Sequence, residues 1–226
     1  MHKIMRTIAL SLVLTTISFC TSAFAQGQGS GDSSRYDVTV KAVELCSDAA
    51  CGATFPLGTG EKSFDIASAS AGGVAGSYAD PIGLPVGSTW THVRVTVDAR
   101  FTVTGSGTDG SVSCTTTSAN DNTDPTTAAA GQIGGVASPQ LMVVPNEGAI
   151  GGNPTAADFA AVNAVKTGPL EVQVTYPLTA AYTVQPFPPT VRVEFDTQDT
   201  LLFVDNGPSC GLVFPMPPSM RVTITN

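Results

Sequence analysis

His92 is the residue of this chain that most resembles a catalytic base. It shares the polar face of a strongly alternating segment with Arg94 and Asp98, and an imidazole beside a carboxylate is the arrangement that activates a serine nucleophile. The chain has no Gly-x-Ser-x-Gly sequence that would present such a serine. We therefore expect no catalytic residues and no enzymatic activity. A hydrolase with an unrecognised site is the alternative.

Two groups of acidic residues could supply oxygen ligands for calcium. Asp121 and Asp124 lie among amides in one polar segment, and Asp196 and Asp199 lie close together nearer the C-terminus. Calcium prefers such hard oxygen ligands, but neither spacing matches an EF-hand loop, and acids in turns commonly cap the turn. We expect no bound metal and no cofactor, and these four residues are the calcium-ligand candidates. No aromatic platform accompanies the acids, which disfavours a glycosidase.

The N-terminus has the three parts of a secretory signal peptide. Lys3 and Arg6 supply a positive start, an apolar run follows over residues 8–19, and Ala23-Phe24-Ala25 forms an A-x-A cleavage site. The apolar run is shorter than the roughly 20 residues that cross a bilayer. We therefore expect cleavage after Ala25 and a mature form without a membrane span. The predicted location is extracytoplasmic: secreted, at the cell surface or in the periplasm.

Four cysteines remain after such a cleavage: Cys46, Cys51, Cys114 and Cys210. An even number of cysteines in an exported protein indicates disulfides, and four cysteines allow three pairings. Cys46 and Cys51 are close enough in sequence to close a local turn, which leaves Cys114 to pair with Cys210. His92 would be the one histidine of the mature chain, so a zinc site is not favoured.

The net charge limits the classes of partner. The chain has 10 basic and 18 acidic residues and a formal charge of −8. An acidic surface repels phosphate backbones, so we expect no nucleic-acid partner. Charged residues make up only 12% of the chain, about half the usual fraction. The mature surface is therefore expected to be hydroxyl-rich and low in charge.

Alternation of apolar and polar residues predicts most of the secondary structure. The clearest segment, residues 91–104, is either one long strand or two strands joined by a bend. Further short strands are predicted at 36–45, 62–69, 111–117, 141–144, 170–176, 191–195, 201–204 and 220–226, with 191–195 and 201–204 forming a pair. The sequence Thr155-Ala-Ala-Asp158 resembles a capping box, so a helix is predicted over 159–165.

These elements predict an all-β protein with long loops and one short helix. An antiparallel β-sandwich, Ig-like or jelly-roll-like, is the expected architecture, because two alternating sheets can bury their apolar faces against each other. The expected organisation is a signal peptide over 1–25, a flexible Gly- and Ser-rich leader over 26–34, and a single sandwich domain over 35–226.

The strand that follows the leader is a candidate for assembly. Its apolar face changes parity once, which indicates a bulge; its apolar residues are Tyr36, Val38, Val40, Ala42, Val43 and Leu45. A strand on a flexible leader can complete its own sheet or that of a neighbour, and head-to-tail contacts of this kind produce filaments.

The predicted function is therefore that of a secreted or cell-surface structural or adhesive protein. Its self-assembling form would be a filament subunit, and its partners would be copies of itself or other surface proteins. The alternative is an extracytoplasmic ligand-binding module that takes calcium or a glycan through the acidic residues at its loop ends.

Overall fold

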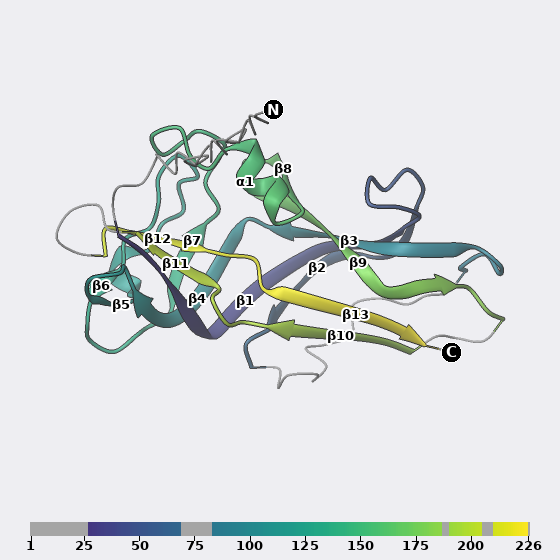
Figure 1. Ribbon diagram of the computed structural model, residues 1–226, viewed down its shortest axis with the longest axis horizontal. Coiled ribbons are helices and arrows are strands. Elements are labelled where there is room, and N and C mark those ends of the chain that lie inside the picture. The colour runs from purple at the N-terminus through teal and green to yellow at the C-terminus, as the bar shows by residue number, and fades with distance from the viewer. Residues whose placement is uncertain (1–26, 69–82, 187–189, 205–209, 226) are drawn as a thin grey trace, which may run out of the picture.

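The computed structural model describes residues 27–68, 83–186, 190–204 and 210–225, and strands dominate it (Figure 1). The predicted signal peptide lies outside the described residues. The elements in chain order are β1 (Gln28–Cys46), β2 (Thr54–Asp65), β3 (Thr89–Asp98), β4 (Arg100–Thr108), β5 (Ser113–Thr115), the 3₁₀ helix η1 (Ser118–Asn120), β6 (Gln132–Ile133), β7 (Gln140–Val143), α1 (Ala156–Ala161), β8 (Ala164–Gly168), β9 (Glu171–Thr183), β10 (Thr190–Asp196), β11 (Leu201–Val204), β12 (Leu212–Pro215) and β13 (Ser219–Thr225). The prediction of an all-β protein with one short α-helix is confirmed.

The strands belong to one 13-stranded sheet and not to two packed sheets. Its main path runs β10-β13-β9-β3-β1-β4-β5-β6, while β2 and β11 also pair with β1. The pairings are antiparallel except that between β13 and β9. The sandwich prediction is not confirmed. Alternation identifies which face of a strand is buried but not which strands are its neighbours, and here one twisted sheet curls until its apolar face covers itself.

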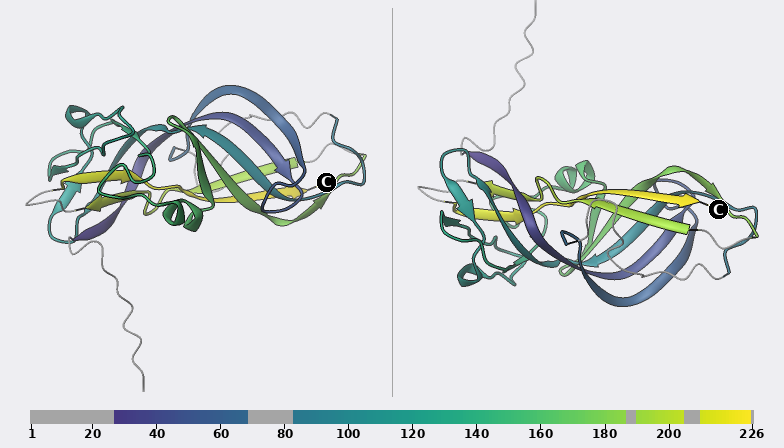
Figure 2. Two further views of the ribbon diagram at one scale, coloured as in Figure 1. Left: turned by 90° about the horizontal axis from the view of Figure 1, so that it is seen from above. Right: turned by 90° about the horizontal axis from the view of Figure 1, so that it is seen from below.

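Strand β1 connects the two ends of the elongated molecule (Figure 2). Its first residues pair with β11 and β4, and its later residues pair with β2 and β3. Its 19 residues span roughly 60 Å at about 3.3 Å per residue. The register against β3 shifts between Val40 and Ala42, so Lys41 is an extra residue on β1. This bulge agrees with the parity change in the sequence, and it keeps the apolar side chains on one face on both sides of the shift.

The structure differs from the predicted flexible leader, because β1 already begins at Gln28. The glycines that make this segment resemble a linker allow close packing instead. A Cβ atom at Gly29 would collide with the Thr108 carbonyl oxygen, and one at Gly31 would lie 2.9 Å from the Phe203 ring. A glycine-rich composition by itself suggests a flexible segment. It does not show that another strand packs closely against these glycines.

The predicted strand at 91–104 divides at Ala99 into β3 and β4. The segments at 191–195 and 201–204 form strands but do not pair with each other: β10 pairs with β13, and β11 pairs with β1 and β12. Strands β8 and β12 were not predicted. Their short apolar stretches carry too little alternation to identify them.

Helix α1 begins where the capping sequence places it but ends earlier than predicted. Thr155 is the N-cap and forms a capping box with Asp158. Val165, at the expected end of the helix, lies in β8 instead. Asn163 has a φ of 54°, a left-handed conformation that ends the helical path and turns the chain into β8.

Two disulfides close the molecule at separate places. Cys46–Cys51 closes the turn between β1 and β2, and Cys114–Cys210 connects β5 to the segment before β12. This is the pairing that the sequence spacing favours. Two disulfides are typical of proteins that fold in an oxidising compartment, so the chain is extracytoplasmic. Among the described residues, no helix is both long and apolar enough to cross a membrane.

Candidate functional site

The structure does not assemble a catalytic group around His92. The His92 Nδ1 atom lies 2.8 Å from Thr91 Oγ1, and the residue is paired across the sheet with Cys46. Asp98 lies six residues further along β3, which separates the two residues by roughly 20 Å. Asp98 instead accepts hydrogen bonds from Arg100. The histidine is therefore an ordinary strand residue.

The calcium-ligand candidates Asp121 and Asp124 both accept hydrogen bonds from nearby groups of the protein. Asp121 Oδ1 accepts a hydrogen bond from the Leu141 backbone N–H at 2.8 Å. Asp124 Oδ1 accepts from both the hydroxyl and the backbone N–H of Thr126, and the hydroxyl hydrogen bond lowers the pKa of Asp124. These carboxylates hold the loop in shape.

The candidates Asp196 and Asp199 do not converge on a common point either. Asp196 Oδ1 accepts a hydrogen bond from the Gln198 backbone N–H. Asp199 lies in a left-handed turn with φ of 54°, and its backbone N–H donates to Asp32. Both side chains are exposed. The arrangement is that of a capped turn at the end of β10.

One group of potential metal ligands does converge within the described part of the chain: Asp109, Cys114 and Cys210. The two cysteines form a disulfide, which leaves no thiolate for a metal. The Asp109 carboxylate accepts backbone hydrogen bonds from Val112, Ser111 and Cys210. These bonds, that of Val112 foremost, hold its pKa far below the ordinary range. The group therefore has a structural role: its hydrogen bonds and its disulfide hold β4, β5 and the segment around Cys210 together.

The assembly candidate, Tyr36 to Leu45, lies in the middle of the chain's own sheet. Strands β2 and β3 pair with its later residues, and β4 pairs with Tyr36. Its apolar residues Tyr36, Val38, Val40, Val43 and Leu45 face an internal cavity, whereas Ala42 is not among the residues that line it. Donation of this strand to a neighbour would require the chain to withdraw its own central strand.

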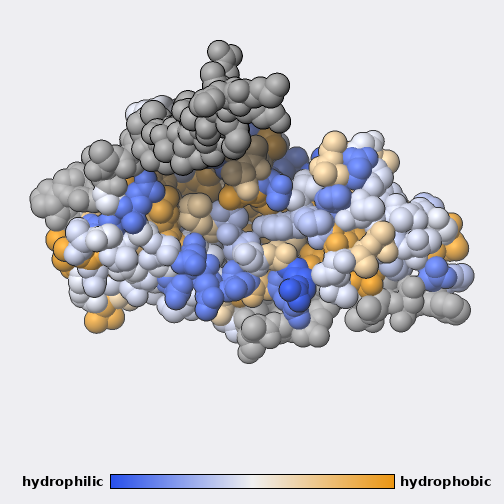
Figure 3. Space-filling view, viewed as in Figure 1, coloured by the Kyte–Doolittle hydropathy of each residue, from blue (hydrophilic) through white to orange (hydrophobic). Residues whose placement is uncertain are grey.

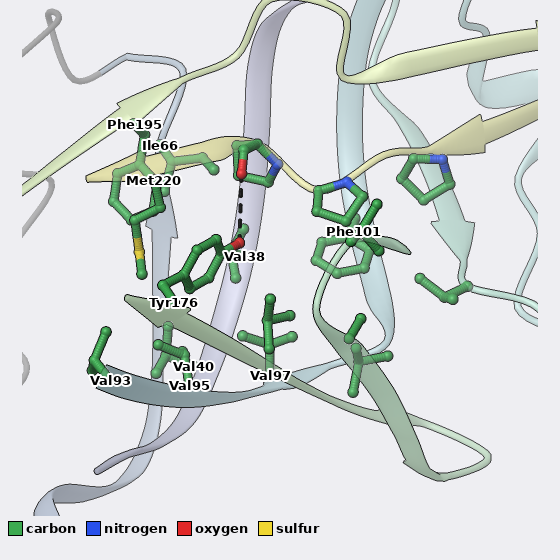
Figure 4. A pocket seen from close by; sticks show the side chains of 18 of the residues that line it. Val38, Val40, Ile66, Val93, Val95, Val97, Phe101, Tyr176, Phe195 and Met220 are labelled. Atoms are coloured by element: carbon green, nitrogen blue, oxygen red, sulfur yellow. Dashed lines mark hydrogen bonds between the residues drawn. The ribbon is translucent and has the colours of Figure 1, made fainter. Parts of the chain in front are cut away.

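That internal cavity is the feature that sequence reasoning missed. It has a volume of about 490 Å³ and lies where β2, β1, β3, β9, β13 and β10 curl around a common axis (Figures 1 and 4). Helix α1 and the proline-rich segment between β12 and β13 also contribute to its wall. On the face shown in Figure 3, apolar residues gather in a recess near the middle of the molecule.

Short side chains explain why the curled sheet stays hollow. Three strands present valines to the cavity: Val38, Val40 and Val43 from β1, Val93, Val95 and Val97 from β3, and Val172 and Val174 from β9. In Figure 4 the labelled valines point toward Met220 and Phe195 on the opposite wall. Valine suits a β-strand but extends only to its γ-carbons, so this wall of valines on β9, β3 and β1 does not reach the opposite wall. The sequence signal was the alternating valine of these three strands, where longer side chains would have extended further into the space.

The polar atoms at the cavity wall are few and mostly paired. The Tyr36 hydroxyl donates to the Met216 carbonyl oxygen at 3.0 Å. The Tyr176 hydroxyl donates to the Pro218 carbonyl oxygen at 3.4 Å, and Figure 4 draws this bond as a dashed line. Burial raises the pKa of Tyr176 to about 12 and that of Tyr36 still further, so both tyrosines are neutral. Asp158 is the charged residue of the described lining.

A second hollow, of about 550 Å³, lies on the polar side of β1, β2 and β4. Of its three carboxylates, Asp37 and Asp98 each form an ion pair with an arginine two residues away in sequence, while Glu61 forms no ion pair among the described contacts. Two of the three charges are therefore neutralised within the protein, and the apolar cavity is the stronger candidate for a functional site. No protein-family model matches the chain, and no curated protein or solved structure shows significant similarity to it.

Proposed function

We propose that this protein is an extracytoplasmic binding protein whose cavity holds an apolar molecule. The observation that carries the proposal is a cavity of about 490 Å³ whose lining is almost entirely apolar and comes from strands, helix α1 and the segments that connect them. This volume lies within the range of small-molecule sites, roughly 300–1,000 Å³. The two disulfides suit a module that works in an oxidising compartment.

The size of the cavity argues for an occupant. Without an occupant, the apolar side chains that line the cavity make no contacts across it, and apolar surface left in contact with water forgoes about 25 cal/mol per Å². A bound apolar molecule restores these contacts and removes the lining from water.

This proposal keeps the binding-module alternative of the sequence analysis but changes its ligand. Calcium and glycans call for available oxygen ligands or polar hydrogen-bonding groups, and the candidate acids already serve their own loops. A structural or adhesive role with filament assembly stays a prediction. It gives no reason for a cavity of this size, whereas binding does.

The proposal is tested with a neutral apolar fluorophore, N-phenylnaphthylamine, titrated into the mature protein. Saturable fluorescence enhancement is expected for the wild type. Val95→Trp fills the cavity from β3 and should weaken binding about tenfold or more, because the added indole competes for the same volume. The matched control is Val165→Trp on β8, where the side chain is 60% exposed and binding should be unchanged.

Circular dichroism confirms that each variant is folded. If Val95→Trp does not fold, Val193→Phe on β10 tests the opposite wall of the same cavity. Absence of saturable binding to the wild type would contradict the proposal, as would equal binding by the wild type and a folded cavity-filling variant.

A further inference from the structure

The described lining of the cavity carries one negative charge and no positive charge. Among the described residues that line the cavity, none is a lysine, arginine or histidine, and the one charged residue, Asp158, is exposed and therefore lies at the solvent edge of the lining. Asp158 is fixed by the capping box, in which its carboxylate accepts the Thr155 backbone N–H at 2.8 Å. A carboxylate or phosphate head group inside this wall would therefore contact no cationic lining residue. Lys166, whose ammonium donates to the carbonyl oxygen of the lining residue Val144, is not itself part of the lining. Burying an unpaired anion is strongly unfavourable.

The cavity wall also offers more hydrogen-bond acceptors than donors. Tyr36 and Tyr176 use their hydroxyl protons on the carbonyl oxygens of Met216 and Pro218, but each phenolic oxygen keeps capacity to accept. Five lining residues have no backbone N–H because they are prolines: Pro145, Pro154, Pro215, Pro217 and Pro218. The wall thus offers mainly acceptors, and a ligand that donates a hydrogen bond suits it better than one that only accepts.

The shape of the lining favours an extended molecule. On β1 the lining runs from Tyr36 to Leu45, which corresponds to roughly 30 Å along the strand. One leaflet of a bilayer holds hydrocarbon of about 15 Å, so a single long alkyl chain fits along this axis. The Tyr176 side chain reaches from β9 to the Pro218 carbonyl oxygen (Figure 4), so its hydroxyl lies at the cavity wall within reach of a bound molecule.

We propose that the cavity takes one long, uncharged hydrocarbon chain that ends in a hydroxyl group, and that it rejects the fatty-acid anion of the same length. This inference rests on the proposed binding function. The alkyl chain contacts the valine walls, and the terminal hydroxyl donates to a tyrosine oxygen or to Asp158. A carboxylate cannot donate, and Asp158 repels it.

The test displaces the bound fluorophore with hexadecanol or with hexadecanoate at pH 8, where the acid is ionised. Hexadecanol is expected to displace with an apparent Kd about tenfold or more below that of hexadecanoate, since only the anion loses its solvation without gaining a partner. Asp158→Asn removes the negative charge while an amide oxygen remains to cap the helix, and it should reduce this discrimination several-fold. Glu147→Gln, an exposed acid outside the lining, is the matched control and should leave the discrimination unchanged.

The tyrosine acceptor is tested with a second pair of ligands. Tyr176→Phe should weaken hexadecanol several-fold and leave hexadecyl methyl ether, which has no hydroxyl proton, unaffected. A loss of both ligands to the same extent would mean that Tyr176 contributes packing only and would contradict its role as acceptor.

The outcomes separate this inference from the proposed function. If the fluorophore does not bind the wild type, the binding function itself fails. If the fluorophore binds but hexadecanoate displaces it as well as hexadecanol does, binding stands and the charge selectivity is overturned. If cholesterol displaces the fluorophore and hexadecanol does not, the cavity takes a rigid ring system and the extended-chain inference is overturned.

Discussion

Asp98 is a nearly buried carboxylate whose main partner is exposed. Its side chain is 7% exposed, whereas that of Arg100 is 47% exposed. It accepts hydrogen bonds from Nε and Nη2 of Arg100 at 2.8 Å each and lies 3.4 Å from Lys41 Nζ. The Arg100 side-chain hydrogen bond is the largest influence on the pKa of Asp98, which falls to about 2 although burial by itself would raise it.

This pKa makes stability dependent on pH in a defined window. A carboxyl group with a depressed folded-state pKa stabilises fully above its unfolded pKa of about 3.9, and the contribution is lost as the pH falls toward about 2. Asp98→Asn should lower the free energy of unfolding by about 1–2 kcal/mol at pH 7, less than the full shift implies because solvent screens the exposed Arg100. Urea denaturation at pH 7, 4, 3 and 2 should show the difference from wild type disappear toward the acidic end.

A second arginine–aspartate pair at the same sequence separation is more exposed and supplies the control. Arg35 and Asp37, both on β1, are two residues apart and form an ion pair at 2.7 Å, with side chains 48% and 27% exposed. Asp37→Asn should change stability by less than about 1 kcal/mol, as surface pairs generally do. A difference between wild type and Asp98→Asn that is equal at pH 2 and pH 7 would exclude the ion pair as its source.

At the scale of elements, the two disulfides constrain the chain very differently. Cys114–Cys210 joins residues 96 apart in sequence and Cys46–Cys51 joins residues 5 apart. Replacing the first pair with alanines should lower the free energy of unfolding by roughly 4–5 kcal/mol, and replacing the second by about 2 kcal/mol, if restriction of the unfolded chain dominates. Denaturant titration of the two double variants gives both values. Equal losses would show that local packing, and not loop length, sets the contribution.

The elements also show what the sequence could and could not predict. The bulge near Lys41 and the start of α1 at Thr155 were predictable, because a parity change and a capping box are local signals. Strand β12 was not, since residues 212–215 acquire their strand conformation by pairing with β11. The two glycines of the expected leader were misread for the same reason: their role depends on Thr108 and Phe203, which are distant in sequence.

The cavity could not be predicted, because it is a property of the whole curled sheet. Each valine-rich face predicts only a buried side of one strand. Whether six such faces meet at a filled core or around a hollow depends on the curl of the sheet and the separation of its walls. The calcium-ligand candidates, by contrast, were chosen by composition. Their hydrogen bonds show that acidic loop residues more often hold a turn than bind an ion.

At the scale of the molecule, β1 makes both ends of the fold a single cooperative unit. Gly31 lies near one end, between β4 and β11, while the C-terminal end of β1 leads to the region of Trp90. The two regions are separated by roughly 50 Å along the strand. Neither end keeps its sheet if β1 leaves, because β2, β3, β4 and β11 all pair with it.

Gly31→Ala tests this coupling. A Cβ at this position would lie 2.5 Å from the Ser106 carbonyl oxygen and 2.9 Å from the Phe203 ring, so the substitution should destabilise the protein by at least about 1–3 kcal/mol. Trp90 is the single tryptophan, it is 7% exposed, and its fluorescence reports the opposite end. We expect the fluorescence midpoint in urea to fall by as much as the midpoint from far-ultraviolet circular dichroism.

Thr123→Ala is the control for that experiment, because Thr123 lies exposed in a loop and such substitutions change stability by no more than about 0.5 kcal/mol. If Gly31→Ala shifts the circular dichroism signal but leaves the Trp90 midpoint in place, the two ends unfold separately. In that case the first part of β1 could detach while the region around the cavity stays folded, and strand donation to a neighbouring copy would become structurally accessible. Coincident shifts would instead mean that withdrawing this strand requires unfolding the whole domain, which would count against the predicted filament assembly and in favour of a monomeric binding protein.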